Sequence, residues 1–493
     1  MDRTLLIPAY VASMAPRDLG DARRLASQVP PWANALEYRL DLSEERIDPR
    51  ALLPIDSRPA IVTYRTLREG GRFEGPADAY RRVVTEAYDA GAIVDVEFSS
   101  GLLASSTVFP ERRRVVVSRH SPFGLPDDWK ESIAAMRATG ANAVKLVAGA
   151  AHVEASLRVG ELQKGLADGV VAIFPMGPAS TPGRVISAHH GAALVYGSIE
   201  GETAPGQIAM RDLLEVYDVV RPERFDALFG VVAGSTARSL SPRLHNTLFR
   251  SRGLRYLYLP LQVADFEREK PHDIAFDPPF RGFAVTQPWK LAAFRAGRPS
   301  EDARRIGAAN TLVWKKGVWR AENTDVDGVF ETLADHGTGE GRSAVVVGAG
   351  GAARAAVVGA RRLGYEVVVT ARRDAEADRV AEELGVDSLA WEDLPSSEAD
   401  LYVNATPVGW KDDEPPAIPV AVMEERPIVF DCVYRRDGKD TTTIRAARAR
   451  KCPVVEGLQM FAVQAVRQAE LFGVEGVTPD EVLSILREGF VRP

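Results

Sequence analysis

The sequence predicts an α/β fold in two parts, a (β/α)8 TIM barrel followed by a region that contains a dinucleotide-binding Rossmann domain. Two observations support this prediction. In the first half, eight short and almost continuously apolar runs alternate with helical segments, which is typical of parallel strands buried on both faces. In the second half, the run AVVVGAGGAARAA at 344–356 passes from valines through glycines into an alanine-rich helix.

The eight apolar runs of the first half are rich in β-branched residues and are separated by helical segments. Eight strand and helix units in this length are what a closed parallel barrel requires. We also expect a long helix at Pro205–Val219 to complete the barrel. The predicted strands are Leu5–Val11, Ala35–Leu40, Ala60–Arg65, Ala92–Phe98, Val115–His120, Ala143–Ala148, Val170–Pro175 and Ala192–Ser198.

Polar residues end these predicted strands, and in such barrels the chemistry lies at the carboxyl-terminal mouth. Lys145, in the apolar run AVKLVAG, is expected to have a lowered pKa and a neutral amine that can attack a carbonyl. His120 offers a base near neutral pH, and three arginines could hold a carboxylate and hydroxyls. Taken singly, a strand lysine is more often a paired side chain and a lone histidine a structural group, but together they favour a catalytic site. The collected residues are Glu37, Arg39, Arg65, Asp95, Glu97, His120, Lys145, Met176 and Arg184.

Composition restricts the classes of function. With 493 residues the chain is too long for one ordinary domain, and 45% hydrophobic and 26% charged residues are ordinary values for globular proteins. A formal net charge of −7 argues against nucleic acid as a partner, so local basic residues must hold any anionic substrate. Only Cys432 and Cys452 occur, so we expect no disulfide framework, no metal and a reducing cytoplasmic location. No run of about 18 apolar residues occurs, and the first residues lack a long apolar segment, so neither a membrane span nor secretion is predicted.

The glycine-rich turn of the second half is expected to bind a dinucleotide. Gly348 and Gly350 let the backbone turn sharply and approach a pyrophosphate at the start of the next helix, although the third small position is Ala353. The following strand, Tyr365–Thr370, ends in a basic turn that suits a 2′-phosphate, which favours NADP over NAD. The alternative is a structural βαβ unit with a solvated basic turn. The residues expected to border the dinucleotide are Gly348, Ala349, Gly350, Gly351, Ala352, Ala371, Arg372 and Arg373.

Five motifs of the first half are EYRLDL at 37–42, VTYRTLREGG at 62–71, VVVSRH at 115–120, AVKL at 143–146 and YGSIEGETAPGQI at 196–208. Together they resemble the type I 3-dehydroquinate dehydratases, a family of metal-free Schiff-base barrels. The resemblance implies that Lys145 forms an imine with the substrate ketone, that His120 acts as general base and then acid, and that Glu69 orients His120. Ser121 and Thr203 depart from the family's usual acidic residue and serine. The resemblance further implies that carboxylate and hydroxyls are bound by Glu37, Arg39, Arg65, Arg184, Thr203 and Gln207.

The second half contains GSTARSLSPRLHN at 234–246, VTQPWK at 285–290, IGAANTL at 306–312, NTDVDG at 323–328, VNATPVG at 403–409 and EGLQMFAVQA at 456–465. In this order they resemble the shikimate dehydrogenases. The resemblance implies that Lys290 and Asp325 are the catalytic pair and that Cys432 and Gly457 border the nicotinamide through their backbone. The alternative for the pair is a surface ion pair. By the same resemblance the substrate is held by Ser239, Ser241, Thr286, Asn310, Tyr434 and Gln464.

Two further features qualify this reading of the second half. The serines of the first motif precede Pro242 at a predicted helix start, where they could also act as a helix cap. Ala284 stands where the family often has asparagine, and Val326-Asp327 extends the usual Asn-Thr-Asp-Gly, so substrate affinity is the property that these departures affect.

The two resemblances together imply a domain division and a combined activity. We expect a barrel at 1–222, a substrate domain at 227–325 completed by 457–493, and an NADP-binding Rossmann domain at 326–456. The implied activity dehydrates 3-dehydroquinate to 3-dehydroshikimate and then reduces this product to shikimate with NADPH. Two alternatives are a metabolite sensor that has lost turnover and a quinate-directed dehydrogenase that prefers NAD. The expected partners are these small molecules, without nucleic acid or membrane, and no oligomeric state follows from the sequence.

Overall fold

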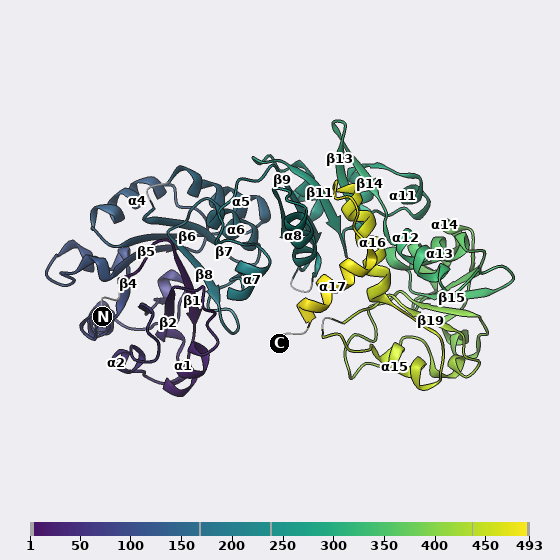
Figure 1. Cartoon of the computed structure of the whole chain (residues 1–493), viewed down its shortest axis with the longest axis horizontal. Helices are drawn as coiled ribbons and strands as arrows, with labels where there is room; N and C mark the ends of the chain where they lie inside the picture. The colour runs from purple at the N-terminus through teal and green to yellow at the C-terminus, as the bar shows by residue number, and fades with distance from the viewer. Residues whose placement is uncertain (1–3, 167–168, 237–238, 436, 491–493) are drawn as a thin grey trace. The chain divides into compact units, whose positions relative to one another are not determined.

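The computed structural model describes residues 4–166, 169–236, 239–435 and 437–490. The chain divides into two compact units between Phe225 and Asp226, with the segment Leu259–Asp265 grouped with the first (Figure 1). In the part of the chain that is described, no helix combines the length and the apolar character needed to cross a membrane.

The first unit is built on eight parallel strands, as predicted. Their order is β7-β6-β5-β4-β3-β2-β1-β8, and β1 pairs with β8, for example at Val11 and Tyr196. The Ala193 N–H donates to the Val171 carbonyl at 3.0 Å, which links the two end strands and nearly closes the barrel. The strands are β1 Ala9–Met14, β2 Ala35–Arg39, β3 Ala60–Thr63, β4 Ile93–Glu97, β5 Val115–Ser121, β6 Ala143–Gly149, β7 Val171–Met176 and β8 Leu194–Ser198.

Two predicted elements of the barrel differ from the structure. The first strand begins at Ala9 rather than Leu5, because Pro8 has no N–H to give to a ladder. The predicted helix at Pro205–Val219 is wrong in extent, since only Met210–Glu215 is helical. Gly206, with φ +72°, lies in a loop packed so closely that an added Cβ would stand 2.1 Å from the Gly177 carbonyl oxygen. The helices are α1 Leu19–Ala26, α2 Pro49–Leu52, α3 Ala77–Asp89, α4 Trp129–Ala138, α5 Val153–Leu162, α6 Thr181–His189 and α7 Met210–Glu215.

A mixed six-stranded sheet of order β10-β9-β11-β13-β14-β12 follows, and apart from the end of β10, which falls in the segment Leu259–Asp265, its strands lie in the second unit. Its core joins Phe229 and Phe249 to Phe472, which lies just beyond the long C-terminal helix α16 (Gly457–Leu471). The end of the chain therefore packs on this sheet. The strands are β9 Ala227–Ala233, β10 Tyr256–Gln262, β11 Phe280–Val285, β12 Arg298–Pro299, β13 Thr311–Lys315 and β14 Val318–Glu322. The helices are α8 Ser241–Ser251, α9 Phe266–Glu269, α10 Lys290–Ala296, α11 Glu301–Ile306, α12 Asp325–Ala334 and α17 Pro479–Phe490.

A parallel six-stranded sheet of order β17-β16-β15-β18-β19-β20 completes the second unit. The order reverses at β15, and in such sheets ligands bind at the carboxyl ends of the strands beside this switch point. The predicted α/β architecture, with a barrel followed by a Rossmann sheet, is confirmed. The strands are β15 Ser343–Val347, β16 Glu366–Thr370, β17 Asp387–Ser388, β18 Leu401–Asn404, β19 Ile428–Asp431 and β20 Val454–Glu456. The helices are α13 Gly351–Arg362, α14 Asp374–Leu384 and α15 Thr442–Ala449.

Candidate active sites

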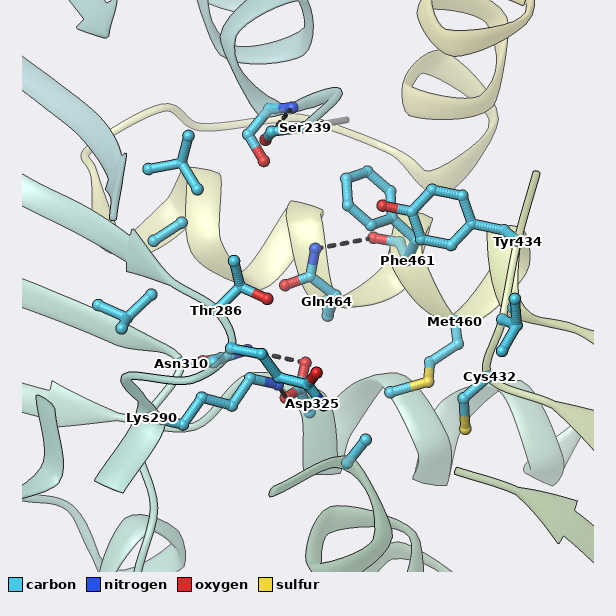
Figure 2. A pocket seen from close by; sticks show the side chains of 18 of the residues that line it. Ser239, Thr286, Lys290, Asn310, Asp325, Cys432, Tyr434, Met460, Phe461 and Gln464 are labelled. Carbon is cyan, nitrogen blue, oxygen red and sulfur yellow. Dashed lines mark hydrogen bonds and ion pairs between the residues drawn. The ribbon is translucent and has the colours of Figure 1, made fainter. Parts of the chain in front are cut away.

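The second unit contains a cavity of about 450 Å³ that brings together distant sequence motifs (Figure 2). Its walls come from the ends of strands β9, β11 and β19, from the starts of α8, α10 and α12, and from α16. It contains every substrate-binding and catalytic residue predicted for the second half. These are Ser239, Ser241, Thr286, Lys290, Asn310, Asp325, Tyr434 and Gln464.

Lys290 and Asp325 form a direct ion pair, with 2.5 Å between Nζ and Oδ2. Their side chains are only 16% and 10% exposed, so the alternative of a surface pair is wrong. Both residues begin helices, α10 and α12, rather than lying inside loops. Since both groups line the cavity, a cationic donor and its carboxylate face any molecule bound there.

Hydrogen bonds hold this pair in position. The Asn310 amide donates to Asp325 Oδ1 at 2.9 Å and to Thr324 Oγ1 at 2.9 Å. Thr324 in turn donates from its hydroxyl to Gln464 Oε1 at 3.1 Å, which connects the start of α12 to α16. Sequence reasoning missed Thr324, although it directly precedes the predicted Asp325.

The alternative role of the serines at the start of α8, a side-chain helix cap, is not observed. Helix α8 begins at Ser241, Leu240 is its N-cap residue, and no side chain caps it. Ser239 Oγ accepts the Ser241 N–H at 3.3 Å, and both serines line the cavity. Residues 237 and 238 of the same motif lie outside the described part of the chain.

The glycine-rich turn lies beside Lys290. Gly348 has φ +130°, and an added Cβ would stand 2.9 Å from the Ala405 carbonyl oxygen, so the turn requires glycine there. Helix α13 begins at Gly351, where a Cβ would stand 3.0 Å from Lys290 Cδ, and no side chain caps this helix. Ala352 lines the cavity from the first turn of the helix.

The other predicted cofactor residues divide into two groups. Cys432 and Gly457 line the cavity, and Gly457 approaches the Cys432 carbonyl so closely that a Cβ would stand 2.6 Å from its oxygen. Ala371 is buried and does not line the cavity, and neither do the exposed Arg372 and Arg373 beyond the end of β16. Gly348, Ala349, Gly350 and Gly351 form the turn from β15 into α13 and do not line the cavity.

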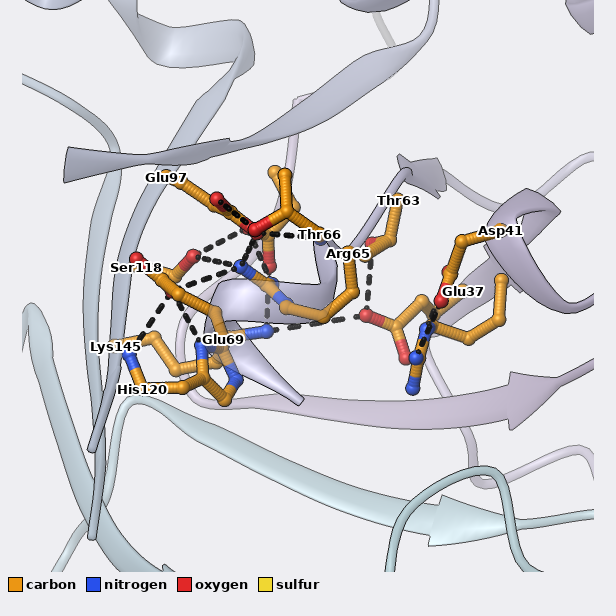
Figure 3. A network of polar contacts seen from close by, with 12 residues as sticks. Glu37, Asp41, Thr63, Arg65, Thr66, Glu69, Glu97, Ser118, His120 and Lys145 are labelled. Carbon is orange, nitrogen blue, oxygen red and sulfur yellow. Dashed lines mark hydrogen bonds and ion pairs between the residues drawn. The ribbon is translucent and has the colours of Figure 1, made fainter. Parts of the chain in front are cut away.

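The mouth of the barrel holds a smaller cavity of about 50 Å³. Figure 3 shows the polar contacts among Lys145, His120 and their neighbours. Lys145 comes from β6, His120 from β5, and Glu37 and Arg39 from alternate positions of β2, so that both point to the barrel interior. Glu69 does not line the cavity but contacts His120. The predicted residues that line it are Glu37, Arg39, Arg65, His120, Lys145, Arg184, Thr203 and Gln207.

The expected apolar environment of Lys145 is wrong. Its Nζ lies 2.5 Å from Asp95 Oδ2 and 3.9 Å from Glu37 Oε1, and it stands 4.8 Å from the centre of the Tyr196 ring. The apolar residues next to Lys145 in sequence are on the opposite face of the strand, because side chains alternate along it. The ammonium group therefore lies near carboxylates from β4 and β2, alternate strands of the barrel.

His120 and Glu69 form the expected contact. Glu69 Oε2 lies 3.0 Å from His120 Nδ1 and also accepts the His120 backbone N–H at 3.0 Å, while Ser99 Oγ donates to Oε1 at 2.9 Å. Burial, together with the positive charges of Arg65 and Lys145, holds the pKa of His120 well below its usual value. Burial also raises the pKa of Glu69 to about 7. At neutral pH His120 is therefore a neutral imidazole, which suits a general base.

Arg65 is the centre of a buried polar network. Its guanidinium lies 2.8 Å from Asp95 Oδ1, 3.2 Å from Glu97 Oε1 and 3.3 Å from Glu69 Oε2, and it donates to Ser118 Oγ at 2.9 Å. A cation with so many partners is a fixed element of the site. In the sequence, Asp95 and Glu97 were recognised as strand-end residues without an assigned role. Ser118 was not predicted, and its position two residues before His120 on β5 is what could have indicated it.

Arg184 and Arg39 are both buried but differ in their partners. Arg39 forms a two-bond ion pair with Asp41 and donates to the Thr203 carbonyl at 2.6 Å. Among the described residues no carboxylate lies within 4.0 Å of Arg184, whose guanidinium stands 5.0 Å from the centre of the Phe174 ring. Burial lowers the pKa of Arg184 to about 10. The charge of Glu202 acts on Arg184, but no described carboxylate lies within ion-pair distance, and such a buried cation lining a cavity is suited to bind an anionic ligand.

Comparison with known proteins finds relatives of both halves of the chain. The family model described as type I 3-dehydroquinase matches residues 10–223, and the model described as shikimate dehydrogenase substrate binding domain matches residues 231–312. A bifunctional 3-dehydroquinate dehydratase/shikimate dehydrogenase of Arabidopsis thaliana, named as chloroplastic, is 28% identical over 472 residues, which are 89% of this chain and 77% of that protein. A shikimate dehydrogenase (NADP(+)) of Maridesulfovibrio salexigens is 32% identical over 268 residues, covering 54% of this chain and 96% of that protein. A crystal structure of a shikimate dehydrogenase in complex with NADP+ shares the fold, with a TM-score of 0.50 and 24% identity over 54% of this chain and 96% of that one.

Proposed function

Since this chain belongs to the shikimate dehydrogenase family and has a type I 3-dehydroquinase domain ahead of it, we propose that it catalyses two consecutive reactions. The first dehydrates 3-dehydroquinate to 3-dehydroshikimate, and the second reduces 3-dehydroshikimate to shikimate with NADPH. The observation that supports this proposal best is the presence of two cavities, one lined by Lys145, His120 and Arg184 and the other by Lys290, Asp325 and several hydroxyl and amide groups. The proposed division is a dehydratase at 1–222, a substrate domain at 227–325 with 457–493, and an NADP domain at 326–456.

In the dehydratase, the substrate carboxylate binds Arg184, the buried cation that has no carboxylate beside it among the described residues. The Lys145 amine attacks the ring ketone, and the resulting iminium withdraws electrons from the adjacent carbon. His120, neutral and held through Nδ1 by Glu69, takes a proton from that carbon and later gives a proton to the departing hydroxyl. The raised pKa of Glu69 lets this carboxyl share the proton that His120 gains.

In the dehydrogenase, the Lys290 ammonium donates a proton to the oxygen of the substrate ketone as it becomes an alcohol. Asp325 and Asn310 hold the amine in position, since Asp325 accepts from both. The remaining cavity hydroxyls and the amide of Gln464 supply hydrogen-bonding partners for a polyhydroxylated ring carboxylate. Ser239 and Ser241 present hydroxyls from the start of α8.

The residues around the glycine-rich turn fit NADP. The turn at Gly348 excludes any side chain, and the N–H groups at the uncapped start of α13 are available for phosphate oxygens. Arg372 and Arg373 offer cations for a 2′-phosphate, with Arg373 also paired to Glu376 at 2.5 Å. When bound, NADPH supplies the hydride for the reduction. A reducing cytoplasmic location is proposed as well, supported by the free thiols of the chain.

A coupled assay tests the proposal. Purified protein supplied with 3-dehydroquinate and NADPH should oxidise NADPH, because the first site makes the substrate of the second. Lys145→Ala should stop this oxidation, and supplying 3-dehydroshikimate directly should restore it. NADPH oxidation that stays unchanged in Lys145→Ala with 3-dehydroquinate as the sole substrate would contradict the order of the two reactions.

A further inference from the structure

The proposed steps leave one buried contact at the reacting nitrogen unexplained, the 2.5 Å contact between Lys145 Nζ and Asp95 Oδ2. Both side chains are almost fully buried, with 5% and 0% of their surface exposed. A buried carboxylate beside the attacking nitrogen does not agree with an amine kept neutral by apolar surroundings. We therefore ask which step of the reaction requires the negative charge of Asp95.

The surroundings of Asp95 direct one oxygen to the lysine. Its Oδ1 accepts from Ser118 Oγ at 2.5 Å and lies 2.8 Å from Arg65 Nη2, which leaves Oδ2 for Nζ. Burial opposes the negative charge of Asp95, but the charges of Arg65 and Lys145 outweigh it and hold its pKa below the usual value. Asp95 is therefore a fixed carboxylate at neutral pH.

Glu37 does not have the same position. Its carboxylate accepts from Ser13 Oγ at 2.6 Å and from Thr63 Oγ1 at 2.9 Å, and it stays 3.9 Å from Nζ. Both oxygens of Glu37 are thus engaged with hydroxyls, and among the carboxylates of the described residues only Asp95 is within hydrogen-bond distance of the nitrogen. The charged and titratable groups around Nζ are Glu37 and Arg39 on β2, Arg65 after β3, Asp95 on β4, His120 on β5 and Tyr196 on β8.

The charge balance of imine formation explains the carboxylate. A lysine ammonium and a ketone give an iminium and one water: the new bond joins nitrogen to carbon, and the carbonyl oxygen leaves with two protons from the nitrogen. The Lys145 nitrogen therefore carries one positive charge as the ammonium before this step and as the iminium after it. The neutral amine occurs only during the attack on the ketone, whereas the iminium cation persists through proton abstraction.

We propose that Asp95 is a catalytic residue of the dehydratase, the counter-ion that keeps the Lys145 nitrogen protonated as an iminium. This inference rests on the proposed Schiff-base reaction. A protonated iminium withdraws electrons from the neighbouring carbon far better than a neutral imine does. A counter-ion that favours the protonated form therefore supports the proton abstraction by His120.

Borohydride trapping of the intermediate tests the role of Asp95. Intact-protein mass spectrometry would measure the adduct formed with 3-dehydroquinate across a pH series, on protein taken from the monodisperse gel-filtration fraction. Trapping falls at high pH, where the iminium loses its proton. In Asp95→Asn this fall should move to lower pH by about one unit or more, since the charge that favours the protonated form is lost.

The matched control is Glu97→Gln, which removes another carboxylate from Arg65 but not from Nζ. It should shift the pH profile clearly less than Asp95→Asn does. Equal shifts would mean that the total charge of the network matters, and an unshifted profile in Asp95→Asn would mean that Asp95 has no influence on the nitrogen; either result overturns the proposal. If Asp95→Asn does not fold, Asp95→Glu provides the test. Its retained negative charge should preserve adduct formation at high pH, and loss of the adduct at high pH would refute the role of Asp95. Absence of any adduct in the unaltered protein would instead refute the Schiff-base reaction itself.

Discussion

Replacing Arg184 by methionine should stabilise the folded barrel while weakening substrate binding. Burial lowers the pKa of this guanidinium from 12.5 to about 10. At about 1.4 kcal/mol per pH unit, the charged form of Arg184 therefore destabilises the folded state by about 3 kcal/mol. The folded protein bears this cost at every pH below about 10, and the unfolded chain does not. Methionine has a similar length and no charge, so Arg184→Met should recover up to about 3 kcal/mol, reduced by the loss of the contact with Phe174.

The binding loss comes from the same group. A hydrogen bond between a charged donor and a carboxylate contributes about 1.5–3 kcal/mol, so kcat/KM for dehydration should fall about 10- to 150-fold. Urea unfolding followed by the barrel's circular dichroism signal measures stability, and formation of 3-dehydroshikimate measures the activity. A less stable Arg184→Met with unchanged kcat/KM would refute the assignment of Arg184 as an unpaired anion-binding cation.

Arg39→Met is the matched control. This arginine is also buried, but it forms a two-bond ion pair with Asp41, whose side chain is fully buried. Removing one partner leaves an uncompensated buried charge, which typically costs about 3–5 kcal/mol. The two substitutions should therefore change stability in opposite directions, although both remove one buried arginine from the same cavity.

Three further substitutions test the remaining assignments. Lys290→Ala should lower the reduction of 3-dehydroshikimate about 10²–10⁴-fold, as expected for loss of a general acid, while dehydration of 3-dehydroquinate continues; equal loss of both activities would indicate a shared site or a collapsed fold. Changing Arg372 and Arg373 together to serine should weaken NADPH binding far more than NADH binding, measured by fluorescence titration, because the charge-assisted bonds to the 2′-phosphate are lost; equal weakening would exclude that contact. Dehydration should become faster as pH rises through about 7, where Glu69 ionises and can stabilise a protonated His120, and Glu69→Gln should remove this dependence; a profile that keeps its rise in the variant would assign it to another group.

The sequence by itself determined the barrel class and the position of most barrel strands. Parallel strands buried on both faces are continuous apolar runs, so seven of the eight predicted barrel strands begin within two residues of the observed ones, as Ala35 and Val115 illustrate. The turn at Gly348 was also predictable, because close backbone approach at positive φ excludes other residues locally. The family motifs likewise identified residues that the two cavities bring together.

Only the tertiary structure decided what surrounds each functional group. Lys145 on β6 has apolar neighbours along its strand, yet its amine contacts Asp95 on β4, fifty positions away in sequence, because side chains alternate between faces and those of alternate strands meet inside the barrel. Arg39 and Arg184 look alike in the sequence, and packing alone pairs the first with Asp41 and leaves no carboxylate near the second among the described residues. Backbone preferences are local properties and can be read along the chain, whereas charge balance, burial and pKa depend on groups that folding brings together from separate strands.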